Sequence, residues 1–547
     1  MSTRSLKKPV ESENRRAWCE LVEKLRANAS EVQLGGGAEN IDKQHAKNRL
    51  TARERISVLC DAGSEFRELG LFAAWKMYSE WGGAPSAGVI TGLARVSGRL
   101  CMLIANDATV KAGAFFPMTA KKTLRAQRIA QENRLPLIYL VDSAGVFLPL
   151  QDEIFPDEDD FGRIFFNNAR LSAEGVPQLA AILGPCVAGG AYLPVMCDKI
   201  VMRDGAGLYI AGPSLVKAAI GQDLSSEELG GAKLHAELSG TIDFREKDDA
   251  EALERIKRLA AHWPAPPPPI YKRAAPEAPA RDAAEILEIF PARSGAEYDI
   301  RTIVECLVDE GSLDEYKADY GRTLVCAFAR LDGWSVGIVA NQKKHQRDPG
   351  KPFELGGVIY PDSADKAARF IMDCNQNRLP LIFFHDVNGF MVGRDAEIEG
   401  IIRSGAKLVN AMSNSVVPKL TVLLGGSYGA GHYALCGKAF GPRFIFAWPT
   451  ARYAVMGGDQ AARTLLDVKL AQLKKSGKTV APEEERALLD DIRAKYIEQS
   501  DPLFAAARLW VDAVIEPEET REWLSAALLA VSQNERIGEF KTGVLQV

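Results

Sequence analysis

Short apolar runs alternate with amphipathic segments along most of this chain. The run LCMLIAND at 100–107 precedes the segment TAKKTLRAQRIAQEN at 119–133, and LPLIYLVDS at 135–143 precedes FGRIFFNNARLSAEG at 161–175. The apolar runs have the length and the β-rich composition of strands, whereas the longer segments are typical of helices. Strands that alternate with helices predict βαβ units around a buried sheet. The predicted fold class is therefore α/β.

The same pattern occurs twice in the chain. NRLPLIYLVDSAG at Asn133–Gly145 is closely similar to NRLPLIFFHDVNG at Asn377–Gly389. Three further pairs keep the same order in both halves: LARVSGRLCMLIAN (93–106) with FARLDGWSVGIVAN (328–341), GPCVAGGAY (184–192) with GGSYGAGHY (425–433), and IAGPS (210–214) with AWPTA (447–451). The offsets lie between 235 and 244 residues, far above the period of about 20–50 residues that is typical of solenoids. We therefore interpret the chain as a duplicated domain.

A proline-rich stretch separates the two copies. HWPAPPPPIYKRAAPEAPA at His262–Ala280 contains four consecutive prolines, which cannot join a helix or a central strand. It is interpreted as a stiff linker, with a proline-rich partner ligand as the alternative. We predict a first domain at 1–262, a linker at 263–281 and a second domain at 282–547. A helical hairpin is expected at about 460–500, with KKSGKT in its turn and no counterpart in the first half.

The composition is that of an ordinary globular protein. Apolar residues make up 47% of the chain and charged residues 25%, and the net charge of −5 argues against non-specific binding of nucleic acid. The nine cysteines form no C-x-x-C pair, so no metal site is predicted, and many are expected to be buried thiols in a reducing compartment. No signal-peptide stretch and no run of 18 apolar residues is present, so we expect a cytoplasmic protein without membrane insertion.

Glycine-rich loops after apolar strands are the candidate sites of chemistry. AILGPCVAGGAY leads from a strand to a predicted helix start in the first half, and TVLLGGSYGAGHY does the same in the second. Small residues leave backbone N–H groups exposed and let a ligand approach closely. Two such groups at a helix N-terminus can form an oxyanion hole. Tight packing of helix on sheet is enough to explain either loop alone, but the duplication favours two holes for two oxyanions.

Side chains offer few alternative catalysts. GGSYG at 425–429 fits the pattern of a nucleophile elbow at Ser427, but an α/β-hydrolase has its histidine well downstream, and the only later histidine here is His432 in the same loop. His432, like His385 at a strand end, is interpreted as a hydrogen-bonded structural residue. No phosphate-binding G-x-x-x-x-G-K-[ST] loop is present. A site of backbone donors without an evident base predicts enolate chemistry in which a cofactor supplies the base.

These segments resemble the carboxyltransferase family of biotin-dependent acyl-CoA carboxylases, a tandem of crotonase-like domains with the ClpP/crotonase ββα-superhelix fold. The resemblance covers nearly the whole chain. The matching segments are KQHAKNRLTARERISVLCD (43–61), NDATVKAGAFFPMTAKKTLRAQRIAQENRLP (106–136), SSEELGGAKLH (225–235), GFMVGRDAEIEGIIRSGAKLVNAM (389–412), GGSYGAGHYALCGKAFGPRF (425–444), AWPTARYAVMGGDQAA (447–462) and WVDAVIEPEETR (510–521). Within the family, FPDEDDFGRIFFN (155–167) and the late hairpin are similar to the methylcrotonyl-CoA and geranyl-CoA carboxylase β subunits.

The resemblance implies an enzyme that transfers a carboxyl group from carboxybiotin to an acyl-CoA, with a branched or unsaturated acyl chain such as 3-methylcrotonyl. Gly189 and Gly190 in the first half would polarise the carbonyl of the CoA thioester. Ala430 and Gly431 in the second half would hold the ureido oxygen of biotin. The other residues implied at the two ligand sites are Gly145, Gly212, Gly389, Gly429 and His432.

The resemblance also implies partners. The family carries biotin on another subunit, and this chain has no Met-Lys-Met biotinylation site, since AWKM at 74–77 is interpreted as an ordinary surface lysine. A biotin carboxylase and biotin carrier subunit is therefore implied, with ATP bound only at that partner. Family members form dimers that assemble into a hexamer, in which the first half of one chain faces the second half of another.

Three features depart from the family pattern and leave alternatives open. Ala144 stands where glycine is usual, His432 stands where asparagine is frequent, and the segment at 343–362 makes its half about nine residues longer than the other. One alternative is the carboxyltransferase subunit of a glutaconyl-CoA-type decarboxylase, which needs a membrane partner. A crotonase-like hydratase or isomerase is another, although that class uses a carboxylate pair that the glycine loops lack. A non-catalytic scaffold is the third.

Overall fold

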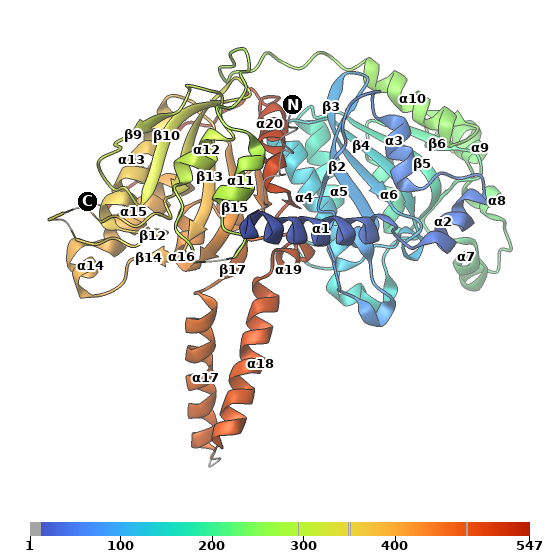
Figure 1. Cartoon of the computed structure of the whole chain (residues 1–547). Helices are drawn as coiled ribbons and strands as arrows, with labels where there is room; N and C mark the ends of the chain where they lie inside the picture. The colour runs from blue at the N-terminus through green and yellow to red at the C-terminus, as the bar shows by residue number, and fades with distance from the viewer. Residues whose placement is uncertain (1–11, 294, 348, 351, 477–479, 547) are drawn as a thin grey trace, which may run out of the picture.

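The computed structural model describes residues 12–293, 295–347, 349–350, 352–476 and 480–546. Within that part of the chain, the strands build two eight-stranded sheets, one in each half, and a separate pair formed by β12 and β14 (Figure 1). The first sheet has the order β1-β2-β3-β4-β5-β6-β8, with β7 beside β5, and the second has the order β9-β10-β11-β13-β15-β16-β18, with β17 beside β15. The identical topology confirms the predicted α/β fold and its duplication.

The strand bounds follow the predicted apolar runs. In the first sheet they are β1 (Arg67–Leu69), β2 (Val89–Val96), β3 (Arg99–Asn106), β4 (Leu137–Ser143), β5 (Gln178–Val187), β6 (Lys199–Arg203), β7 (Gly207–Tyr209) and β8 (Phe244–Glu246). In the second they are β9 (Asp314–Tyr316), β10 (Leu324–Leu331), β11 (Trp334–Asn341), β13 (Leu381–Val387), β15 (Lys419–Tyr428), β16 (Phe444–Ala447), β17 (Arg452–Ala454) and β18 (Ala513–Val514). The pair β12 (Val358–Ile359) and β14 (Gly389–Phe390) is parallel. All residues of β4 and β13 are buried, as expected for parallel strands covered on both faces.

Helices make the crossovers between parallel strands. α4 (Pro117–Asn133) and α13 (Pro361–Gln376) each begin with a proline, whose missing N–H costs nothing in the first helical turn. They connect β3 to β4 and β11 to β13, while α5 (Phe161–Ala173) and α15 (Ile401–Ser413) connect β4 to β5 and β13 to β15. The other α-helices placed within or around the two sheets are α2 (Ala38–His45), α3 (Ala52–Leu59), α6 (Gly189–Val195), α7 (Pro213–Ile220), α8 (Ser226–Gly230), α9 (Ala232–Leu234), α10 (Asp249–Ala261), α11 (Ile286–Ile289), α12 (Ile300–Glu305), α14 (Arg394–Glu399), α16 (Gly429–Ala434) and α19 (Pro502–Ala507).

One of the four predicted repeat pairs is wrong. Val187 pairs with Tyr209 in the first sheet and Tyr428 pairs with Ala454 in the second, so Tyr209 and Ala454 are equivalent. IAGPS at 210–214 therefore lies opposite VMGGD at 455–459, and AWPTA at 447–451 lies earlier, at the end of β16. The letters of two short Gly/Pro-containing segments matched by chance, whereas the strand register fixes the true equivalence.

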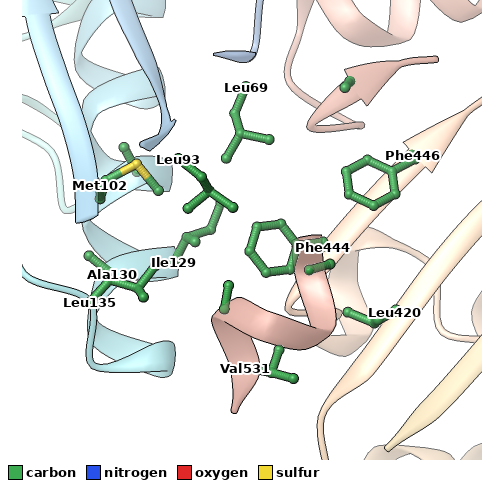
Figure 2. Close-up of a cluster of buried hydrophobic side chains, with 14 of the residues drawn as sticks. Leu69, Leu93, Met102, Ile129, Ala130, Leu135, Leu420, Phe444, Phe446 and Val531 are labelled. Carbon is green, nitrogen blue, oxygen red and sulfur yellow. The ribbon is translucent and has the colours of Figure 1, made fainter. Parts of the chain in front are cut away.

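The two halves pack against each other through a shared hydrophobic core. Figure 2 shows Leu93 and Ile129 of the first half facing Phe444 and Val531 of the second. Val531 lies on α20 (Thr520–Val531), which is inserted between the two sheets (Figure 1). Contact between the halves within one chain is therefore extensive and apolar, which makes their relative position rigid.

The N-terminal helix and the proline-rich stretch also contact the second half. The indole N–H of Trp18, on α1 (Glu13–Gln33), donates to the carbonyl of Phe290 at 2.8 Å, and α1 lies across the molecule (Figure 1). The proline-rich stretch runs beside the β10–β11 hairpin, where the N–H of Ala274 donates to the carbonyl of Gly333 at 2.8 Å. This bond anchors the stretch on the second half.

Two long helices project from the second half, α17 (Gly458–Lys475) and α18 (Pro482–Ser500) (Figure 1). Of the KKSGKT segment assigned to the turn between them, residues 477–479 lie outside the described residues. No helix in the described part of the chain is both long enough and apolar enough to cross a membrane.

Candidate active site

The two predicted glycine loops have the same geometry. In the first half the chain passes from β5 to α6, and in the second from β15 to α16. Ala188 and Gly429 stand at equivalent positions of the two turns, and φ is 54° at both. This left-handed conformation is natural for glycine and uncommon for alanine. It turns the chain sharply, so that the first residues of each helix face the end of the neighbouring parallel strand.

A glycine from the neighbouring strand end faces each loop. A Cβ built on Gly190 would lie 3.8 Å from the Cα of Gly145, and a Cβ built on Gly431 would lie 3.3 Å from the Cα of Gly389. Gly145 and Gly389 both have positive φ, of 89° and 128°. The structure thus brings together Gly145 with Gly190 and Gly389 with Gly431, two equivalent pairs separated by one domain repeat.

Packing accounts for some of these glycines but not for all. A Cβ on Gly189 would lie 2.5 Å from the ring of Phe161, and a Cβ on Gly431 would lie 2.6 Å from a methyl group of Val387. Tight packing is therefore sufficient to explain both. Gly190 differs, because a Cβ there would make only ordinary contacts, the nearest at 3.7 Å from Oγ of Ser143. Its small size leaves space between the loop and the strand end at Gly145.

The loops present free backbone donors. The first N–H groups of a helix have no partner within the helix. Among the described residues, no protein acceptor is found for the N–H groups of Gly189, Gly190, Ala430 or Gly431. These unpaired N–H groups are of the kind that could donate to an oxyanion, which stays the role predicted for the loops.

A buried carboxylate lies beneath each loop, and sequence reasoning missed both. Asp386 accepts hydrogen bonds from the N–H of Gly426 at 2.9 Å and from Nζ of Lys343 at 3.0 Å. Asp142 is its repeat equivalent and accepts from Arg49 and, at 3.0 Å, from Arg55. The aspartate repeated in VDSAG and HDVNG was the available signal.

The two carboxylates differ in the donor that each one receives from its loop. Pro185 stands where the second half has Gly426, and proline has no N–H to donate. The guanidinium of Arg49 lies close to this position, because a Cβ on Gly184 would clash with both Arg49 and Asp142. An arginine from the N-terminal segment thus supplies the bond to Asp142 that the loop backbone cannot supply.

The second loop contains a hydrogen-bonded chain of three side chains. Ser427 Oγ lies 2.9 Å from Nδ1 of His385 and 2.8 Å from Nδ1 of His432. Burial lowers the pKa of His385 to about 3, helped by nearby His432, and burial lowers the pKa of His432 to about 4. Ser427 is only 2% exposed, unlike the exposed serine of a nucleophile elbow. The two histidines are hydrogen-bonded, as predicted, but no sequence pattern indicated that they share a serine.

A cavity of about 590 Å³ opens beside the second loop. Second-half residues alone line it, among them Gly429, Ala430, His432, Tyr433, Tyr453, Tyr496 and Trp510. Its walls are mostly apolar and aromatic, with the loop donors and His432 at one side. Val455 and the base of α18 complete it, so the projecting helices contribute directly to the cavity.

The remaining predicted residue and the long segment lie at the edges of the loops. Gly212 caps the N-terminus of α7, and the N–H of Ala188 in the loop donates to the carbonyl of Tyr209 just before it, at 3.1 Å. The segment at 343–362 begins with Lys343, which binds Asp386. It also contains Gly357, whose carbonyl accepts from the N–H of Asn388 at 2.7 Å. Residues 348 and 351 of this segment lie outside the described residues.

This chain is similar to several known proteins over nearly its whole length. The carboxyl transferase domain matches residues 43–544. The β1 subunit of the biotin-dependent 3-methylcrotonyl-coenzyme A carboxylase of Mycobacterium tuberculosis is 47% identical over 519 residues, which covers 94% of each chain. The mitochondrial methylcrotonoyl-CoA carboxylase β chain of Dictyostelium discoideum is 43% identical over 510 residues, 93% of this chain and 84% of that one. The β subunit of P. aeruginosa geranyl-CoA carboxylase superposes with a TM-score of 0.85 at 34% identity, over 100% of this chain and 99% of the other.

Proposed function

The chain belongs to the carboxyl transferase family, as a carboxyltransferase subunit of a biotin-dependent acyl-CoA carboxylase, and we propose that its acceptor is a branched or unsaturated acyl-CoA such as 3-methylcrotonyl-CoA. Its crotonase-like fold is that of the solved relative. The proposed acyl group is the one named for the relatives that are 43–47% identical over nearly the full chain. The late helices and the 155–167 segment support the same assignment.

The observation that carries the proposal is the duplicated donor loop. Transfer of a carboxyl group to an acyl-CoA develops negative charge on two carbonyl oxygens, one on each substrate. A protein with two equivalent loops, each with unpaired N–H groups and a facing glycine, can stabilise both charges. A single donor of this kind is typically worth roughly 3–4 kcal/mol in the transition state.

The first loop is assigned to the acyl-CoA. The N–H groups of Gly189 and Gly190 would donate to the thioester oxygen and stabilise the enolate that forms when the acyl group loses a proton. Space beside Gly190 would let the thioester approach the backbone, since among the described residues only Ser143 and Gly145 come within 4 Å of a Cβ built there. For an enoyl-CoA the proton leaves the γ carbon, and the same donors stabilise the delocalised charge at the thioester oxygen.

The second loop is assigned to biotin carried by the partner. Biotin, when bound, supplies the carboxyl group and the base for the acyl proton. The cavity beside Ala430 fits such a group, because its apolar and aromatic walls suit a fused ring while Ala430 and Gly431 offer donors for a ureido oxygen. Gly429 and His432 line this cavity, and Gly389 faces the loop from the strand end.

The assembly is proposed on the same basis. A biotin carboxylase and biotin carrier subunit would supply carboxybiotin and would bind ATP. The chain itself would form dimers that assemble into a hexamer, with the first loop of one chain facing the second loop of another. None of the nine cysteines, all of which lie in the described part of the chain, forms a disulfide, which supports a reducing compartment such as the cytoplasm.

The test uses the native complex. The chain is co-purified with its biotin-containing partner, and ATP-dependent fixation of labelled bicarbonate is measured across a panel of acyl-CoAs. We expect a higher kcat/KM for 3-methylcrotonyl-CoA or another enoyl-CoA than for acetyl- or propionyl-CoA. A preference for propionyl-CoA would overturn the acyl assignment. Decarboxylation coupled to a membrane subunit, without ATP-dependent fixation, would instead assign the chain to a glutaconyl-CoA-type decarboxylase.

A further inference from the structure

The repeat provides an internal control for the side chains around the second loop. The first half places only apolar residues and one thiol where the second half places His385, Ser427 and His432. By strand register and repeat position, the equivalents in the first half are Val141, Cys186 and Ala191. The fold of the loop therefore does not require polar residues at these positions, and their presence points to a task specific to the second half.

The hydrogen bonds that link His385, Ser427 and His432 can run in only one direction. Nε2 of His385 bonds the carbonyl of Leu435, so it must donate. His385 is fully buried and neutral, so its Nδ1 accepts, and the hydroxyl of Ser427 is the donor. Since Ser427 has one proton, its oxygen must accept from Nδ1–H of His432. The tautomers of both histidines are thus fixed by the geometry.

The hydrogen-bond chain of His385, Ser427 and His432 encloses the donor loop. The hydrogen bond between His432 and Ser427 spans residues 428–431, which include the N–H groups of Ala430 and Gly431. His385 then ties Ser427 on β15 to Leu435 just after α16. Gly437 supports the other side of the His432 ring, because a Cβ there would lie 2.3 Å from Nε2. The first half closes its loop with a single thiol, from Sγ of Cys186 to the carbonyl of Gly190 at 3.0 Å.

We propose that His385 and Ser427 are positioning residues of the transfer reaction, which act through His432 to hold the Gly429–Gly431 donors in place for the biotin group. This proposal rests on the function proposed above. Hydrogen-bond donors stabilise a developing oxyanion only when their orientation is fixed before the reaction. A loop of small residues has little side-chain packing of its own, so a closed polar chain is an effective way to fix it.

The choice of variants follows from the direction of this hydrogen-bond chain. Ser427→Ala and His385→Leu break it, whereas His385→Gln preserves it, because the Gln oxygen can accept from Ser427 while its amide donates to Leu435. We expect Ser427→Ala and His385→Leu to lower kcat for carboxyl transfer at least tenfold, with KM for the acyl-CoA within twofold of wild type. His385→Gln should stay within about threefold of the wild-type kcat.

Cys186→Ala is the matched control in the first half. It should change KM for the acyl-CoA and leave amide hydrogen exchange of the second loop at the wild-type rate. Amide hydrogen exchange gives a readout that does not need activity. Exchange of the 429–436 amides should rise at least tenfold in Ser427→Ala and His385→Leu, and stay at the wild-type rate in His385→Gln.

The proposal would be overturned if Ser427→Ala and His385→Leu kept the wild-type kcat and the wild-type rate of amide hydrogen exchange. Equal defects in correctly folded His385→Gln and His385→Leu would do the same, because the hydrogen-bond direction would then be irrelevant. An inactive wild-type complex would refute the proposed function instead. The amide exchange rates would still decide whether the hydrogen bonds of His385, Ser427 and His432 hold the loop.

Discussion

Ala188 and Gly429 have the same φ, 54°, at the same point of the two donor loops. At Ala188 ψ is −127°, a combination that a residue with a Cβ adopts only under strain of roughly 1–3 kcal/mol. Ala188→Gly should therefore raise the free energy of unfolding by about 1 kcal/mol, after the larger entropy loss of glycine is subtracted. The reciprocal Gly429→Ala should lower it, since its Cβ would also lie 2.9 Å from the carbonyl oxygen of Val455. Urea unfolding of both variants checks the pair, and shifts of the same sign would contradict the shared geometry.

Repetition made much of this fold predictable. The strands of Asn133–Gly145 and Asn377–Gly389 could be found because their apolar letters recur in order, and the two glycine loops followed from the same recurrence. Strand register could not be found in this way, and IAGPS was matched to the wrong segment because short Gly/Pro-containing segments match easily. The packing of α1 on the second half was also beyond reach, since an amphipathic helix does not reveal which surface it covers.

The candidate site was predictable only where it is built from backbone. Small residues mark exposed N–H groups, so Gly190 and Gly431 could be selected from the sequence. The carboxylates of Asp142 and Asp386 could not, because their cationic partners come from distant segments: Arg49 lies 93 residues from Asp142. His385 likewise meets Ser427 across 42 residues, a contact that only strand pairing creates.

Asp512 should be a critical residue for stability. It is fully buried between the halves, where it binds Arg125 of α4 through two bonds of 2.8 and 2.7 Å and Lys438 through a third. Burial alone raises the pKa of Asp512, but the charges of Arg125 and Lys438 outweigh it and hold the pKa well below its usual range. Asp512→Asn leaves two cations uncompensated, and we expect a loss of about 3–5 kcal/mol in the free energy of unfolding.

The control for Asp512 is an exposed ion pair of similar length. Arg26 pairs with Glu516 at 2.6 Å, but its side chain is 64% exposed. Arg26→Ala should therefore cost no more than about 1 kcal/mol. Both variants are compared by denaturant unfolding at one protein concentration, because assembly shifts the midpoint. An equal effect of the two substitutions would refute the importance of burial.

The neutral histidines should make the protein less stable in mild acid. The pKa of His385 is about 3 in the folded chain, against an ordinary value near 6.5. Below pH 6.5 the unfolded state therefore binds a proton that the folded state does not, so stability falls as pH falls, and the loss continues until pH reaches the folded value. At pH 5 the loss is on the order of 2 kcal/mol. His385→Gln removes one of the two histidine titrations and should reduce the fall of the thermal midpoint between pH 7 and 5, with the remainder due to His432. An unchanged pH dependence would contradict the assignment.

Gly190 and Gly189 should respond differently to the same substitution. Gly189→Ala places a Cβ 2.5 Å from the ring of Phe161 and should destabilise the first half, whereas Gly190→Ala meets no atom closer than 3.7 Å. Gly190→Ala should therefore fold normally, yet raise KM for the acyl-CoA about tenfold or more, because the added methyl group would occupy the space beside Gly145 that is assigned to the thioester. Thermal unfolding and steady-state kinetics separate the two effects. A normal KM in Gly190→Ala would place the thioester elsewhere.

The last prediction concerns how the two loops meet. The cavity beside the second loop is lined by second-half residues alone, so a first loop that completes it is expected from another chain. Gly190→Pro removes an N–H donor from the first loop, and Ala430→Pro removes one from the second. Both positions lie in the first turn of a helix, where proline is tolerated, so both variants should fold and be nearly inactive. When the two variants are mixed and reassembled, half of the dimers should combine one chain of each kind. Each such dimer has one site made from an intact first half and an intact second half, so about a quarter of the wild-type activity should return. Subunit exchange is verified by mass spectrometry of differently tagged chains. If exchange is complete and the mixture stays inactive, each chain must build its site alone.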